Sequence, residues 1–258
     1  MIVSACYITN TGKVRSANED SLLVNDLLVT EADRDRAECR GSGERRQIYI
    51  VADGMGGHAK GEVASKTVLE AFRERYGEME SAGQIREVIG LAKERLNAIA
   101  RADRNAFGLG TTVTGVALRE GRAVVFNCGD SRGYRFSEDS FERITRDHSL
   151  VQELFEEGLV TEEEMRIHPQ KHLITSAVTG DLRDLLPVLE VKELDLVGGQ
   201  RFVLCTDGVW ESMSKAEMRG CLSIALLEAA VQALFKTTME RGARDNLSVI
   251  ALDIESVE

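Results

Sequence analysis

The hydrophobic pattern of this chain groups strands with strands and helices with helices, and this grouping limits the fold more than any single motif does. Two strand patterns at the start, 2–9 and 21–29, precede a buried run, Ile48 to Ala52, and two helical patterns follow it. Further strand patterns are expected at 111–118, 122–128, 131–136, 141–144, 173–178, 188–194, 201–205 and 247–252. Because a doubly wound parallel sheet would need alternating strands and helices, this order predicts an α+β fold with antiparallel sheets.

Length and composition predict a single domain spanning residues 1–258. The chain has 258 residues, only two prolines and no Gly/Ser-rich linker. Residues 31–46 hold ten charged side chains, five of each sign, and predict a solvated excursion between two strands. Residues 149–172 contain two capping-box patterns and predict a small helical flap.

Charge and cysteine usage narrow the functional class. A formal net charge of −11 argues against nucleic-acid binding, because phosphate backbones attract basic surfaces. The five cysteines are scattered without a C-x-x-C pair, and we expect reduced thiols in a cytoplasmic protein. No signal peptide and no membrane-spanning apolar run is expected.

The stretch Asp53-Gly54-Met55-Gly56-Gly57-His58 joins a buried strand to a helix. Its glycines allow close approach of a ligand, and its carboxylate suits a hard cation. Two alternatives remain open from these residues: a tight turn with a solvated Asp, and the dinucleotide fingerprint G-x-G-x-x-G/A. Against the second, Asp53 would face a pyrophosphate with the wrong charge, and no second parallel strand with an acid follows.

Three further acids fall at or next to strand ends, as Asp53 does: Asp130, Asp207 and Asp245. Four carboxylates brought together cannot stay ionised without cations to offset them. No His or Cys stands in ligand spacing with them, so an all-oxygen site for Mg²⁺ or Mn²⁺ is indicated. Two such ions can activate a water and clamp a phosphoryl group, and Arg15 can bind the remaining phosphate oxygens.

Seven short motifs in order along the chain resemble those of the type 2C (PPM) metal-dependent serine/threonine protein phosphatases of the compact bacterial kind. The motifs are Thr11-Gly12-x-x-Arg15-x-x-Asn18-Glu19-Asp20, Asp53-Gly54-Met55-Gly56-Gly57, Gly110-Thr111-Thr112, Gly129-Asp130-Ser131-Arg132, Asp147-His148, Thr206-Asp207-Gly208 and Asp245-Asn246. The resemblance implies an antiparallel β-sandwich of two sheets flanked by helix pairs (α-β-β-α), with the flap added.

The resemblance also implies two Mn²⁺ or Mg²⁺ ions per chain. Asp53 would bridge them, and the Gly54 carbonyl would bind one. Asp207 and Asp245 would bind the other, while Glu19 would reach a metal directly or through water.

Further roles follow from the same resemblance. Arg15 would bind the substrate phosphate. Asp20 and Asn246 would support the metal ligands by hydrogen bonding. Asp130, together with Asp207, would form a third and weaker metal site, where Glu211 is a further candidate acid.

The implied reaction is hydrolysis of phosphoserine or phosphothreonine by direct attack of a metal-bridging hydroxide. This chain has Met55 where eukaryotic members have a His two residues after the bridging Asp, so the general acid is open between metal-bound water and His58. The expected partners are phosphorylated proteins and a cognate Ser/Thr kinase, and we expect a monomer without nucleic-acid or membrane binding. A catalytically silent regulatory member that binds a phosphoprotein is the alternative.

Overall fold

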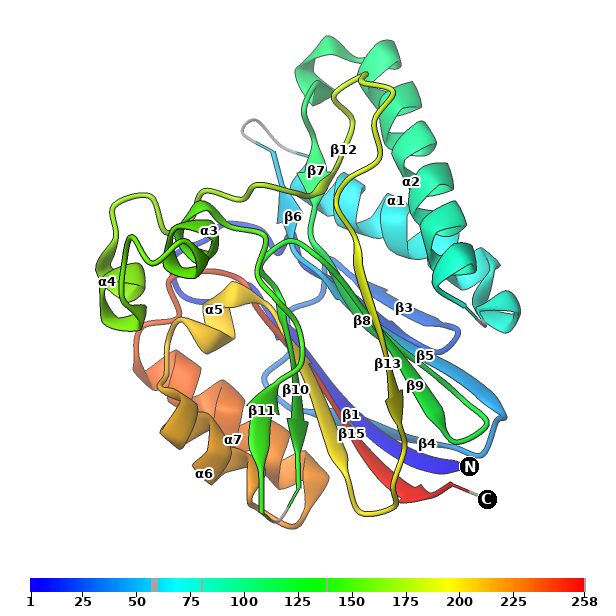
Figure 1. Cartoon of the computed structure of the whole chain (residues 1–258), viewed down its shortest axis with the longest axis vertical. Coiled ribbons are helices and arrows are strands. Elements are labelled where there is room, and N and C mark those ends of the chain that lie inside the picture. Colours follow the sequence, from blue (N-terminus) through cyan, green and yellow to red (C-terminus); the bar gives the residue numbers. More distant parts are fainter. Residues whose placement is uncertain (57–59, 80, 138, 258) are drawn as a thin grey trace.

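The computed structural model describes residues 1–56, 60–79, 81–137 and 139–257, and two six-stranded antiparallel sheets form its centre (Figure 1). The first sheet has the order β11 (Phe141–Arg143), β10 (Arg132–Phe136), β14 (Arg201–Cys205), β15 (Leu247–Ser256), β1 (Ile2–Asn10), β4 (Glu38–Ser42). The second has the order β13 (Glu190–Asp195), β9 (Arg122–Cys128), β8 (Val113–Arg119), β5 (Arg46–Ala52), β2 (Ser21–Val24), β3 (Leu27–Thr30). The predicted α+β class with antiparallel sheets is confirmed.

Helices cover the outer face of each sheet, which completes the predicted α-β-β-α layering (Figure 1). The long helices α1 (Gly61–Glu74) and α2 (Ala82–Ala102) pack on the second sheet, and α5 (Asp207–Trp210), α6 (Lys215–Leu222) and α7 (Leu227–Glu240) pack on the first. Two 3₁₀ turns, Tyr76–Glu78 and Arg104–Ala106, flank α2.

Strands of the two sheets are apolar on both faces because each face meets a different core. In β5, Tyr49 and Val51 point into the layer between the sheets, whereas Ile48, Ile50 and Ala52 pack under α1 and α2. This two-residue alternation explains why the segment is a continuous apolar run instead of an alternating one.

A small helical flap and a short third sheet lie at one end of the sandwich. The flap carries α3 (Leu150–Glu156) and α4 (Glu162–Ile167), whose N-caps are Ser149 and Thr161, as their capping patterns predict. The third sheet has the order β12 (Val178–Thr179), β7 (Gly110–Thr111), β6 (Gly54–Met55). Within 173–178, where a strand was expected, the described structure has only an isolated bridge at Ile174 and the first residue of β12.

Two expectations about the first fifty residues are wrong in detail. The run 21–29 is a hairpin instead of one strand, because Asn25 takes a positive φ and forms a tight turn with Asp26. The excursion 31–46 includes β4, which pairs with β1. Its exposed, charged side chains are typical of an edge strand and gave no apolar signal.

The expectation of reduced thiols is also wrong for one pair. Cys6 of β1 and Cys39 of β4 are directly opposite in register and form a disulfide, which ties the excursion to the sandwich. The remaining thiols, Cys128, Cys205 and Cys221, are free. Within the described residues, no helix has the length and apolar character that a bilayer crossing requires.

Candidate functional site

Strand register brings the predicted acids to one end of the sandwich. Asp53 follows β5, Asp130 follows β9 and Asp207 follows β14, while Asp245 precedes β15 and Asp20 precedes β2. In the first sheet, the end of β14 and the start of β15 are adjacent, since Cys205 pairs with Val249. In the second, Ser21 pairs with Ala52. Because neighbouring strands are antiparallel, the last residue of one strand lies beside the first residue of the next, at the same end of the sheet.

Backbone contacts of Asp53 hold it against β7 and β8. Its N–H donates to Thr112 Oγ1 (3.0 Å), and its carbonyl accepts from the Thr112 N–H and the Thr111 hydroxyl (2.9 Å each). The two threonines therefore fix the backbone of Asp53. The next residue, Gly54, is buried, and a Cβ there would lie 2.2 Å from the Gly61 carbonyl oxygen, so only glycine fits.

One side chain beside the start of β15, that of Asn246, makes three hydrogen bonds to the loop from Thr11 to Glu19. Asn246 accepts a hydrogen bond from the Glu19 N–H and donates to the carbonyls of Thr11 and Ala17, each at 2.9 Å. Sequence reasoning assigned Asn246 to the support of Asp245. The Asn246 backbone N–H donates to Asp245 Oδ1 at 2.9 Å. Its side chain also holds the segment that carries Arg15 and Glu19.

Substitution Asn246→Ala is expected to free this loop. Three backbone groups would lose their partner, which should lower the free energy of unfolding by on the order of 3 kcal/mol. Trypsin should then cleave after Lys13 or Arg15 at least about 10-fold faster. Mass spectrometry of timed digests measures this, with exposed Asn105→Ala as the matched control. Equal cleavage rates in the two variants would contradict the role given to Asn246.

Within the loop, Arg15 points to the acids. Its Nη2 donates to Asp245 Oδ2 at 2.7 Å, and this hydrogen bond is the main cause of the raised pKa of Arg15. The charges of Glu19 and Asp53 raise that pKa as well. About half of the Arg15 side chain stays exposed, so its guanidinium is accessible to an anion from solvent.

Burial is the main cause of raised pKa values throughout the acidic cluster. It raises the pKa of Asp20 to about 7, against hydrogen bonds from Ser248 and Thr206 that lower it. It also raises the pKa of Asp207 to about 7, helped by the charges of Asp245 and Glu211. The pKa values of Asp53 and Asp130 are raised well above the usual range by burial and then by neighbouring acids, among them Asp207.

Glu19 completes the cluster. Burial and the charge of Glu62 raise its pKa. Glu19, Asp53, Asp130 and Asp207 are therefore acids with raised pKa values in one cluster, and the charge of Asp245 contributes to the rise at Glu19, Asp53 and Asp207. The position of His58, the imidazole considered as general acid, lies outside the described residues.

The donor chemistry of this cluster fits divalent cations. Asp207 Oδ1 and Asp20 Oδ1 are buried oxygens without a hydrogen-bond partner in the described structure, and acids that raise one another's pKa are stabilised by a bound cation. In the described part of the chain, no group of three or more His, Cys, Asp or Glu side chains already stands in metal-binding geometry. The fit of divalent cations to this cluster therefore depends on its buried carboxylate oxygens and on its negative charge.

Other contacts at the site were not found from the sequence. Ser248 and Thr206 donate their hydroxyls to Asp20 Oδ2 at 2.6 and 2.9 Å. Thr206 stands beside Asp207 and was a possible signal, whereas Ser248 lies inside an apolar strand pattern and gave none. Glu211, a candidate acid for a third metal site, has its carboxylate 2.9 Å from Lys171 Nζ.

Arg132 forms an ion pair with buried Asp147. It binds Asp147 through three hydrogen bonds of 2.6 to 3.1 Å. The neighbouring His148 is buried and accepts from the Gly129 N–H through Nδ1.

Comparison with known proteins gives consistent matches along the chain. Residues 31–250 match the family model described as protein phosphatase 2C. The serine/threonine protein phosphatase PstP of Mycobacterium tuberculosis is 32% identical over 95% of this chain, which spans only 44% of the PstP length. The serine/threonine phosphatase stp of Listeria innocua is 28% identical over 96% of this chain and 94% of its own.

Among solved structures, the catalytic domain of a PstP in complex with two manganese ions is similar to this chain. The TM-score is 0.81 at 28% identity, and the match covers 99% of this chain and all of the other. The similarity thus extends over both sheets, the covering helices and the end of the sandwich where the acids meet.

Proposed function

The chain belongs to the protein phosphatase 2C family, and on this premise we propose that it hydrolyses phosphoserine and phosphothreonine in proteins. The observation that carries the proposal is the convergence of Asp53, Asp207 and Asp245 with Arg15 at one end of the sandwich. A phosphoryl group needs both an anion-binding guanidinium and cations that neutralise its charge, and this end supplies the ligands for both.

The residues proposed to hold two Mn²⁺ or Mg²⁺ ions are Asp53, the Gly54 carbonyl, Asp207, Asp245 and Glu19. When bound, the ions would lower the pKa of a water for direct attack on phosphorus and would offset the phosphoryl charge. Asp130 is proposed for a third, weaker site, and this assignment is supported by the charge of Asp207, which raises the pKa of Asp130.

Side chains of the protein would bind the substrate phosphate and orient the groups around it. Arg15 would bind two phosphate oxygens through its forked N–H groups. Asp20 accepts hydrogen bonds from two hydroxyl groups and would in turn orient water molecules or metal-ligating side chains by hydrogen bonding. The departing alkoxide needs a proton. We propose that a water molecule supplies this proton. If a side chain supplies it instead, His58 is the candidate.

We further propose that residues 1–258 act as one phosphatase domain, since β1 and β15, from opposite ends of the chain, pair along nine residues of β1. The flap at 149–172 and the excursion at 31–46 are proposed as surfaces for substrate choice. A cognate kinase, a monomeric state and a cytoplasmic location are part of the same proposal.

Phosphate release from a phosphothreonine peptide tests the proposed function. The assay is run with Mn²⁺, with Mg²⁺ and with EDTA, on protein shown to be folded by circular dichroism. We expect turnover with either metal and none with EDTA. A folded protein without turnover under any metal condition would contradict the proposal and favour the alternative of a silent phosphoprotein-binding member.

The raised pKa values predict how the metal-free protein responds to pH. Between about pH 4 and 7 the folded state binds protons at Asp20 and Asp207 that the unfolded state has released, so unfolding is easiest at higher pH. The stabilisation from these protonated acids is complete below the unfolded pKa near 4 and is lost as the pH rises through about 7.

In EDTA, the free energy of unfolding of the wild type should fall between pH 5 and pH 7.5. We expect this fall to be smaller in Asp207→Asn, by on the order of 1–3 kcal/mol. Urea unfolding of the wild type and the variant at both pH values measures the difference. Mn²⁺ should stabilise the wild type more at pH 7.5 than at pH 5. Identical pH slopes for wild type and variant would show that Asp207 is not a strongly perturbed acid.

A further inference from the structure

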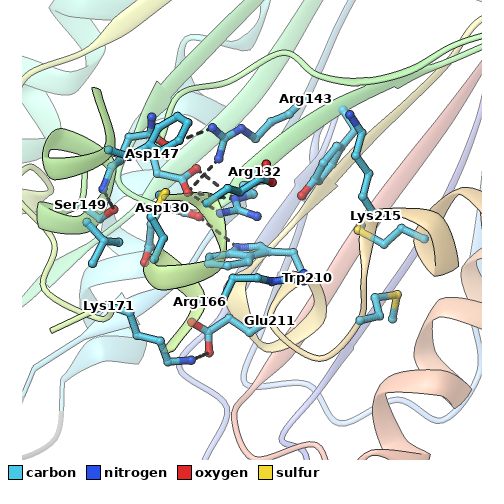
Figure 2. Close-up of a pocket in the computed structure, with 18 residues that line it drawn as sticks. Asp130, Arg132, Arg143, Asp147, Ser149, Arg166, Lys171, Trp210, Glu211 and Lys215 are labelled. Carbon is cyan, nitrogen blue, oxygen red and sulfur yellow. Dashed lines mark hydrogen bonds and ion pairs between the residues drawn. The ribbon is translucent and has the colours of Figure 1, made fainter. Parts of the chain in front are cut away.

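A cavity of about 350 Å³ lies between the flap and the segment formed by α5 and α6 (Figure 2). Its lining includes Asp130, so the cavity lies beside the acidic cluster. None of the roles proposed above for catalysis or metal binding uses the rest of this cavity. Its position next to the proposed phosphate site makes it a candidate for binding the chain that flanks the phosphorylated residue.

The floor of the cavity is rigid and partly aromatic. The Arg132 guanidinium stacks on the Trp210 ring, 3.4 Å from its centroid, and is held by buried Asp147. Arg143 also binds Asp147, at 3.0 Å. Trp210 Nε1 donates to the Asp130 carbonyl at 3.1 Å, which connects this floor to the acidic cluster (Figure 2).

The walls are apolar on both sides. Phe155 of α3 and Met165 of α4 line the flap side, while Met213 and Met218 line the opposite side. Methionine side chains adapt to ligands of different shape, and Phe155 keeps 40% of its surface exposed. An apolar side chain of a bound peptide would bury against this set.

Charge at the rim favours an anionic neighbour for that side chain. Arg166 on the flap and Lys215 on α6 line the cavity and have no hydrogen-bond or ion-pair partner among the described residues. Of the acids in the lining, Asp147 and Glu211 are already paired with cations, and Asp130 belongs to the cluster. Glu162 is the remaining acid, so unpaired cations outnumber it in a chain whose net charge is −11.

We propose that this cavity is a specificity pocket for the phosphoprotein substrate, which takes an apolar side chain that flanks the phosphorylated residue and is followed or preceded by an acidic residue. The inference rests on the proposed function. Arg166 and Lys215 pair with the acidic residue, and the apolar walls with Trp210 enclose its neighbour.

Peptide scanning tests the preference. A Leu-Glu pair and, separately, a Glu-Leu pair are moved through each position on either side of phosphothreonine in an otherwise Ala/Gln peptide, and kcat/KM is compared with the parent peptide. We expect at least one placement to raise kcat/KM by about 10-fold, and Lys in place of Glu at that placement to remove the gain. A flat profile, with p-nitrophenyl phosphate still hydrolysed, would overturn the pocket while leaving the phosphatase function standing.

Variants locate the preference in the cavity. R166E/K215E is expected to lower kcat/KM for the favoured peptide by about 5–10-fold, as two partly exposed ion pairs would, without changing turnover of p-nitrophenyl phosphate. Exposed Lys236→Glu of α7 is the matched control for charge. An equal loss on the parent peptide, or in the control, would contradict the assignment.

Binding can also be followed without turnover. Trp210 is the single tryptophan of the chain, so its fluorescence reports on the cavity directly. The dephosphorylated favoured peptide should shift this fluorescence with a Kd that rises about 5–10-fold in R166E/K215E. An unchanged spectrum at saturating peptide would overturn the proposal whether or not the protein hydrolyses phosphate.

Discussion

Substitution Asp53→Asn is expected to lower kcat for phosphate release by about 10³-fold. The proposed bridging position gives this carboxylate contact with both ions, and the ions supply several kcal/mol of the stabilisation of the transition state. An amide oxygen has the same size but lacks the charge that offsets two cations. Initial rates on a phosphothreonine peptide at saturating Mn²⁺ measure the loss.

Protein stability separates this loss from misfolding. Burial and neighbouring acids raise the pKa of Asp53, so ionised Asp53 is unfavourable in the metal-free fold. Asparagine should therefore keep or raise the melting temperature in EDTA. It should also reduce the stabilisation by Mn²⁺. Asp195→Asn, at an exposed position of β13, is the matched control and should change none of these quantities. Near-normal turnover in Asp53→Asn would contradict the bridging role.

Much of the fold could be predicted because the strands are buried on both faces. The run Ile48 to Ala52 is apolar throughout, and β15 is apolar from Val249 to Leu252; such runs are the strongest signal in a sequence. The acids at the strand ends could be predicted for the same reason. Once an apolar run is recognised as a strand, the acid that directly precedes or follows it is placed at the strand end.

The parts that escaped prediction depend on partners distant in sequence. Strand β4 is charged and exposed, and only its pairing with β1 makes it a strand. The bond between Cys6 and Cys39 depends on that same register, which cysteine spacing does not encode. Likewise, the role of Asn246 beside Asp245 could be predicted, whereas its side-chain hydrogen bonds reach residues more than 220 positions away.

Substitution Arg15→Ala is expected to have two effects of opposite sign. The guanidinium is proposed to bind the substrate phosphate, so its loss should lower kcat/KM on a phosphothreonine peptide by about 10²-fold, in line with one charged, forked contact to the reacting group. In the metal-free fold, however, Arg15 pairs with Asp245 at 2.7 Å. A cation that binds Asp245 competes with this ion pair, so the variant should need less Mn²⁺ for half-maximal activity.

Titration of activity with Mn²⁺ at several peptide concentrations separates the two effects. Arg15→Lys is the conservative control, because an ammonium keeps the charge near Asp245 but lacks the fork that binds two phosphate oxygens. It should therefore keep the Mn²⁺ requirement of the wild type while losing most of the phosphate affinity. If Arg15→Ala instead raises the Mn²⁺ requirement, Arg15 supports the metal site, and its pairing with Asp245 does not compete with metal binding. If kcat/KM is unchanged in both variants, another cation binds the phosphate.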